Sequence, residues 1–149
     1  MSSSSASLPF RAFKEISSES RSVTALAFSP SGEYIAYGSE EGIVAIHELQ
    51  TSKSYDGKVC SRVTGLKWVP NRQEPALIIS ERNGHLHVLA RVAGQFKETV
   101  NVMGFIAPVT ALDIYTNPPY ICLAVGNGDV VDLVTLNIHT LKEGLYQFF

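Results

Sequence analysis

The chain repeats itself, and this repetition limits its possible folds more than any other feature. The segment VTALAFSPSGEYIAYGSEEGIVAIHEL begins at Val23, and related segments begin with VTGLKWVP at Val63 and VTALDIYT at Val109. The three starts are spaced by 40 and then 46 residues, whereas 19, 21 and 19 residues separate each valine from the glycine that opens the closing segment of its unit. A constant interior with variable connections indicates one structural module whose insertions fall in loops.

Within each unit the hydrophobic pattern has the period of β-strands. VTALAF, EYIAYGS and IVAIHEL in the first unit are short runs rich in β-branched and aromatic residues. The turn SPSG separates the first two runs, and EEG, RNG and GNG precede the third run of each unit. More polar segments follow as outer strands, namely SKSYDGKV, GQFKETVNV and HTLKEGLYQFF. The sequence therefore predicts an all-β protein built from four-stranded antiparallel sheets.

The pattern V-T-A-L-x-F-S-P-x-G, a strand ending in Gly-Ser, and then x-x-G-x-(I/V)-x-(I/V) resembles the WD40 repeat. That resemblance implies β-propeller blades of four antiparallel strands. It divides the chain into a disordered Ser-rich tail (1–9), three WD40-like blades (about 10–52, 53–94 and 95–140) and a C-terminal outer strand (141–149). Three blades form an incomplete ring unless the chain self-associates.

The resemblance is degenerate where the family places its terminal Trp-Asp dipeptide. The three matching positions hold His47-Glu48, Leu89-Ala90 and Leu133-Val134. We therefore expect the buried hydrogen-bonded tetrad of many such repeats to be absent and apolar packing to hold the blades together.

Apolar residues should occupy matched positions in the three blades, with Asp132 as the one charged member that needs a hydrogen bond or an exposed position. The predicted set is Leu26, Phe28, Ile35, Val44, Ile46, Leu66, Trp68, Ile78, Leu86, Val88, Leu112, Ile114, Leu123, Val130 and Asp132. Trp68 takes the place of Phe28 and Ile114, which favours a core residue; an aromatic ligand platform in the propeller channel is the alternative.

Composition is that of an ordinary globular protein, with 45% hydrophobic and 17% charged residues among 149. No apolar run approaches the ~18 residues of a membrane span. The start MSSSSASLPF lacks the basic and apolar regions of a secretory signal, so we expect a cytoplasmic protein, with the nucleus as alternative. The two cysteines, Cys60 and Cys122, indicate neither a disulfide framework nor a zinc site.

Charge is distributed unevenly along the chain. Residues 1–50 carry 3 basic and 6 acidic groups, residues 51–100 carry 8 and 4, and residues 101–149 carry 1 and 4. The basic residues of the middle third are scattered over several segments instead of clustering with aromatic residues, so nucleic-acid binding is not favoured.

Catalytic motifs such as GxSxG, HExxH or a phosphate-binding glycine loop do not occur, and we predict no enzyme activity and no cofactor. His85 and His87 would project from one face of a strand and could offer two imidazoles to a metal. Cys60, Glu81 or Asp113 could supply a third ligand, but no spacing selects one of them. We therefore predict no metal site.

The resemblance implies a protein-interaction scaffold that presents its blade loops to other proteins or peptides. The predicted contact residues lie in loops expected on one face: Glu40, Glu41, Arg82, Asn83, Phe105, Asn127 and Asp129. Phe105 replaces the usual histidine of a Gly-His dipeptide and so has either packed inward or been left for a partner. Two alternatives remain open, namely a structural fragment of a longer propeller whose other blades carry the function, and a small-ligand or nucleic-acid site in the basic second repeat.

Propellers close with typically four to eight blades, and this sequence supplies three. The segment PFRAFKEIS, before the first unit, has the character of an outer strand belonging to some other blade. Open blades would leave apolar faces and strand edges in water. We therefore expect either a two-fold dimer of three plus three blades or a union with the remaining blades of a larger propeller.

Overall fold

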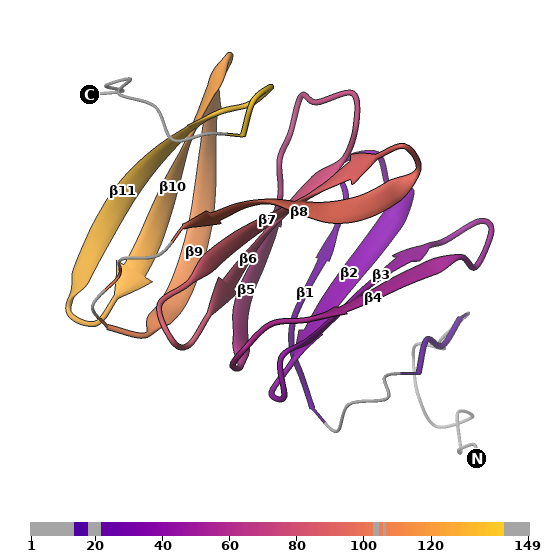
Figure 1. The fold of residues 1–149 in the computed structure, drawn as a ribbon, viewed down its shortest axis with the longest axis horizontal. Coiled ribbons are helices and arrows are strands. Elements are labelled where there is room, and N and C mark those ends of the chain that lie inside the picture. The colour runs from indigo at the N-terminus through magenta and orange to yellow at the C-terminus, as the bar shows by residue number, and fades with distance from the viewer. Residues whose placement is uncertain (1–13, 18–21, 103–104, 106, 142–149) are drawn as a thin grey trace, which may run out of the picture.

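The computed structural model describes residues 14–17, 22–102, 105 and 107–141, and these contain eleven β-strands and no helix. Three antiparallel sheets lie side by side (Figure 1). Blade 1 contains β1 (Val23–Phe28), β2 (Tyr34–Ser39), β3 (Ile43–Glu48) and β4 (Ser54–Lys58). Blade 2 contains β5 (Val63–Trp68), β6 (Ala76–Glu81), β7 (Leu86–Val92) and β8 (Gln95–Val102). Blade 3 contains β9 (Val109–Asn117), β10 (Tyr120–Asn127) and β11 (Val130–Asn137).

The predicted all-β blades are confirmed, with the strands of each sheet hydrogen-bonded in chain order. The observed blades begin and end about one strand later than the predicted repeat boundaries. For example, β4 pairs with β3 of blade 1, although its residues lie in the second predicted unit, 53–94. The predicted tail and the outer strand of blade 3 fall largely outside the described residues, and residues 14–17 form no strand.

The innermost strands of neighbouring blades contact one another directly. The Thr24 hydroxyl donates a hydrogen bond to the Val63 carbonyl at 2.6 Å, which joins β1 to β5. The Trp68 indole N–H donates to the Ala27 carbonyl at 3.0 Å across the same boundary. β4 and β8 form the opposite edges of their sheets, and the three sheets lie side by side as propeller blades do (Figure 1).

The repeated Val-Thr pair marks a β-bulge in every blade. The register between the first two strands shifts at Thr24, Thr64 and Thr110, so that each threonine lies opposite no partner residue. The side chain uses this position for polar contacts, since Thr64 and Ser80 share a hydroxyl hydrogen bond of 2.9 Å. Bulges change strand direction and increase twist. The repeat thus encodes a bend at the same point of each blade.

The core lies between the blades. We call leading face the sheet face that carries Leu26 and Phe28 in blade 1 and its equivalents Leu66 and Trp68 in blade 2 and Leu112 and Ile114 in blade 3. The opposite, trailing face carries Val44 and Ile46, Leu86 and Val88, and Val131 and Leu133 in the same order. The trailing face of blade 1 packs on the leading face of blade 2. In the same way, the trailing face of blade 2 packs on the leading face of blade 3.

Trp68 is a core residue, as the sequence favoured. Its side chain is buried and its ring stacks on Tyr34 with a centroid distance of 5.9 Å, while Phe96 approaches it edge-on at 6.1 Å. These aromatic rings join the two blades by apolar contact.

The predicted set of matched positions needs two corrections of register. Phe28, Trp68 and Ile114 pair with Ile35, Leu77 and Leu123, so Leu77 and not Ile78 occupies the matched position. In blade 3 the β10–β11 turn has only two residues, Gly128 and Asp129, which shifts every later position by one. Val131 therefore replaces Val130 as the equivalent of Val44, and Val134 replaces Leu133 as the equivalent of His47.

Candidate functional site

The turns between second and third strands lie beside the loops that lead into the next blade. An atom added as Cβ at Gly42 would lie 2.6 Å from the Val59 carbonyl oxygen, and one at Gly84 would lie 2.7 Å from that of Phe105. Both glycines have positive φ, of 86° and 95°, which side chains rarely adopt. Residues 40–42, 59–62, 82–85, 105, 107–108 and 128–129 thus form one surface, which we call the loop face.

The predicted contact residues take two different positions on the loop face. Five are exposed at turns and are accessible to a partner: Glu40, Glu41, Arg82, Asn83 and Asp129. Phe105 is half-buried and packs against the core between blades 2 and 3. Asn127 is buried, and burial removes it from the surface that a partner could touch.

Asn127 belongs to a matched set of buried polar residues whose structural role no sequence motif indicates. Ser39, Glu81 and Asn127 end the second strand of their blades and oppose Val23, Val63 and Val109. Glu81 Oε1 accepts hydrogen bonds from the Ser61 N–H at 2.7 Å and from its hydroxyl at 3.2 Å. Asn127 Oδ1 accepts one from the Ala107 N–H at 2.9 Å. Polar side chains therefore tie the interblade loops to the sheets, in addition to apolar packing.

In blades 2 and 3 the buried polar residue of the second strand also contacts a polar side chain on the third strand. Asn127 Nδ2 donates to Asp132 Oδ2 at 2.8 Å, which supplies the hydrogen bond expected for Asp132. In blade 2 the equivalent of Asp132 is His87, whose Nε2 contacts Glu81 Oε2 and whose Nδ1 contacts Glu98 Oε1. The one sequence signal for these pairs was Asp132, a charged residue at a strand position where an apolar residue is expected.

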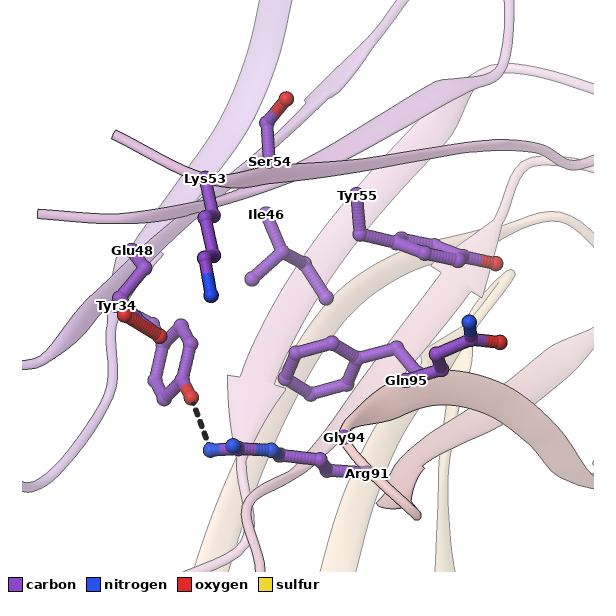
Figure 2. A pocket seen from close by; sticks show the side chains of 10 residues that line it. Tyr34, Ile46, Glu48, Lys53, Ser54, Tyr55, Arg91, Gly94 and Gln95 are labelled. Atoms are coloured by element: carbon purple, nitrogen blue, oxygen red, sulfur yellow. Dashed lines mark hydrogen bonds between the residues drawn. The ribbon is translucent and has the colours of Figure 1, made fainter. Parts of the chain in front are cut away.

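A groove of about 310 Å³ lies between blades 1 and 2 (Figure 2). Ile46 and Tyr55 contribute apolar surface, and the charged groups that line it are Glu48, Lys53 and Arg91. This volume is at the lower end of the range for small-molecule sites. Arg91 Nη1 donates to the Tyr34 hydroxyl at 2.5 Å, and Arg91 Nε lies 3.9 Å from Glu74 Oε2. Arg91 thus already has internal partners.

Burial raises the pKa of Tyr34 above its usual range. Arg91 acts in the opposite direction, while Glu48 and Glu33 add to the increase. The phenol is therefore neutral at physiological pH and accepts the Arg91 hydrogen bond as a neutral hydroxyl.

Several basic residues of the second repeat serve the fold. Arg72 Nε donates to the Ile138 carbonyl at 3.0 Å, and desolvation lowers the pKa of this guanidinium. Lys67 pairs with Asp113 at 3.6 Å. Arg62 and Arg82 are exposed and line a hollow of about 620 Å³ on the loop face. The basic charge is thus divided among separate surfaces.

The two ends of the stack are open sheet faces with exposed apolar side chains. On the leading face of blade 1, Leu26 and Phe28 are each 64% exposed, whereas their equivalents Leu66 and Trp68 in blade 2 are 4% and 5% exposed. On the trailing face of blade 3, Val131 is 68% exposed and Leu133 is 57% exposed. Contiguous apolar surface of this kind marks interaction sites in soluble proteins.

Comparisons with known proteins identify the fold. No family model matches the sequence, and no curated protein matches it significantly. Among solved structures, the chain is similar to the computationally designed Ika4 protein, with a TM-score of 0.62, 22% identity and coverage of 89% of this chain and 75% of that one. It is also similar to the Cps50 (Swd1) β-propeller domain of Myceliophteria thermophila, with a TM-score of 0.58, 13% identity and coverage of 82% and 42%.

The chain therefore has the fold of β-propeller blades, and it spans less than half of the Cps50 chain. Among the described residues, no helix is long and apolar enough to cross a membrane.

Proposed function

We propose that this chain is a protein-interaction scaffold of the WD40 type, and that its primary partner is another set of propeller blades bound at the open ends of the stack. The observation that carries this proposal is the contrast at matched positions, where Leu26 and Phe28 are exposed and Leu66 and Trp68 are buried under a neighbouring blade. The leading face, which binds a neighbouring blade in blade 2, is thus exposed in blade 1 and available to a partner.

The second copy of this chain is the occupant that we propose. In a two-fold pair, the trailing face of blade 3 in each protomer would cover the leading face of blade 1 in the other. Both contacts would repeat the pairing seen between blades 1 and 2 and between blades 2 and 3. The resulting ring of six blades falls within the usual four to eight, and two-fold pairing is the commonest symmetry of soluble oligomers.

The loop face would then remain free to bind further proteins or peptides. Glu40, Glu41, Arg82, Asn83 and Asp129 are exposed there and serve as the proposed contacts. Rigid blades that support such loops favour binding as the activity, with no catalytic role assigned to the chain.

Sedimentation equilibrium of the purified chain tests the pairing. We expect a mass of twice the 16.2 kDa of one chain. Phe28→Asp places a charge on the leading face of blade 1 and should produce a folded monomer, because burying an unpaired carboxylate is costly. Val92→Asp is the matched control, since Val92 is 47% exposed but lies at the end of β7, and this variant should remain paired.

A wild-type chain that stays monomeric at all concentrations would overturn the pairing with a second copy. Equal dissociation by Phe28→Asp and Val92→Asp would show that association does not use the leading face.

A further inference from the structure

Three metal-ligating side chains converge in blade 2, next to the loop face. One ligand atom from each of Glu81, His85 and His87 lies within 4.8 Å of the other two. Glu81 Oε2 lies 3.8 Å from His85 Nδ1 and contacts His87 Nε2 directly. A tetrahedral zinc ion with bonds of about 2.0–2.2 Å separates its ligand atoms by roughly 3.3–3.5 Å. Small side-chain rotations would therefore bring the three atoms to ligand distance.

The β6–β7 hairpin explains why these residues meet although they are separated in sequence. The Glu81 N–H donates to the His85 carbonyl at 3.0 Å, so the two residues oppose each other across the turn. His87 follows His85 by two positions along the extended chain and returns to the same face. The hairpin thus selects Glu81 from the three candidate third ligands that the sequence left open.

The position of His87 between two carboxylates suits a metal ligand that is held by a second carboxylate. Both ring nitrogens contact carboxylate oxygens, of Glu81 and Glu98, and ionised carboxylates only accept hydrogen bonds. An imidazole with one N–H can donate to only one of them, whereas an imidazolium donates to both. A cation bound between Nε2 and Glu81 Oε2 would leave Nδ1–H to donate to Glu98, which is the usual carboxylate–histidine–metal arrangement.

Glu81 is fixed in an orientation that leaves one oxygen available. Its Oε1 accepts both hydrogen bonds from Ser61, at 2.7 and 3.2 Å, while Oε2 faces the two histidines. The Glu81 side chain is fully buried and that of His87 is 8% exposed, but that of His85 is 26% exposed. A metal ion would therefore reach the cluster past His85, where a water molecule could complete four-coordination.

The other blades carry no equivalent ligand set. Blade 3 has Val130, Asp132 and Asn127 at these positions, and the Asn127–Asp132 hydrogen bond satisfies the polar pair without a cation. Blade 1 has Ser39, Ile43 and Ala45. The repeat itself therefore requires neither the two histidines nor the glutamate.

We propose that Glu81, His85 and His87 bind a divalent transition-metal ion, with Zn²⁺ as the best fit, and that Glu98 is a positioning residue for His87. Two imidazole nitrogens and one carboxylate oxygen are a ligand set that zinc accepts, and a fourth position stays open to water. The site would attach the 59–62 loop to blade 2 through Ser61 and Glu81, and it does not depend on the pairing of chains.

Calorimetric titration of the untagged, chelator-treated protein with ZnCl₂ tests the site. We expect saturable binding of one Zn²⁺ per chain and a higher melting temperature when the metal is present, since a ligand of the native state stabilises it. His85→Ala should weaken the affinity at least about tenfold, and Glu98→Gln, which keeps all three ligands, should weaken it about 10- to 100-fold. Co²⁺ absorption provides a second measurement, because tetrahedral coordination gives visible bands that His85→Ala should abolish.

Two variants serve as controls. His139→Ala removes an exposed histidine outside the cluster and should leave zinc binding unchanged. The double variant Glu81→Asn with His87→Asp installs the hydrogen-bonded pair of blade 3, so it should fold and lose zinc binding. Absence of saturable binding by the wild-type chain would overturn the proposal, and so would equal affinity of the wild type and His85→Ala.

Discussion

Blades 1 and 2 place similar side chains at equivalent positions, yet only one of the two leading faces is covered. Trp68 stacks on Tyr34, and Leu66 and Trp68 share one buried cluster with the blade 1 trailing face, whereas Leu26 and Phe28 remain 64% exposed. The difference arises from position in the stack. Blade 1 covers the leading face of blade 2, whereas no blade among the described residues covers the leading face of blade 1. A repeat sequence therefore specifies a surface that binds blades, and the number of repeats present decides whether that surface becomes core or interface.

The largest expected effect comes from truncating the equivalent aromatic residues in the two blades. Trp68→Ala should reduce the free energy of unfolding by about 3–5 kcal/mol, because it removes a buried ring and leaves a cavity. Phe28→Ala, measured by chemical denaturation at concentrations where the chain is monomeric, should stay within about 0.5 kcal/mol of the wild type. Equal losses for the two variants would contradict the assignment of the leading face of blade 1 as open.

A second pair of variants compares the trailing faces with an added methyl group. Gly38 lies under blade 2, and a Cβ there would meet Val63 Cγ1 at 2.3 Å. Gly126 is the equivalent residue of blade 3, where the nearest atom is Ala111 Cβ of the same sheet at 3.2 Å. Gly38→Ala should cost about 1–3 kcal/mol of stability through overpacking, and Gly126→Ala should cost less. Thermal denaturation of both variants measures the difference, and a larger loss for Gly126→Ala would show that the end of blade 3 is not open.

The smallest expected effect concerns His47, on the leading face of blade 1. Its equivalents in blades 2 and 3 are Leu89 and Val134. Its ring stacks on Tyr37 with a centroid distance of 5.7 Å, and among the described residues its Nε2 is a buried side-chain nitrogen without a hydrogen-bond partner. His47→Trp should leave the stability unchanged or raise it slightly, because it adds apolar area. Differential scanning calorimetry would detect the shift. A marked loss of association at unchanged melting temperature would instead assign His47 to the interface.

Much of the fold was predictable because strand identity depends on local patterns. The Val-Thr starts, the alternating hydrophobic runs and the turn glycines located β1 to β3 and their equivalents within a residue or two. The register of blade 3 was not predictable from spacing, since the two-residue turn at Gly128 replaces a longer turn in the other blades. A change of one residue in a turn moves the following side chains to the opposite face.

The sequence by itself determined that this chain forms a repeated set of antiparallel blades, because period-two hydrophobicity and turn residues act over a few neighbouring positions. It also indicated that these blades have apolar faces to cover. Only the tertiary structure decided which face of each blade is covered, that Glu81 and not Cys60 or Asp113 joins the two histidines, and that Asn127 is a buried tie instead of a surface contact. Those outcomes depend on hairpin register and on contacts between residues 20 or more positions apart, which no local pattern of side chains specifies.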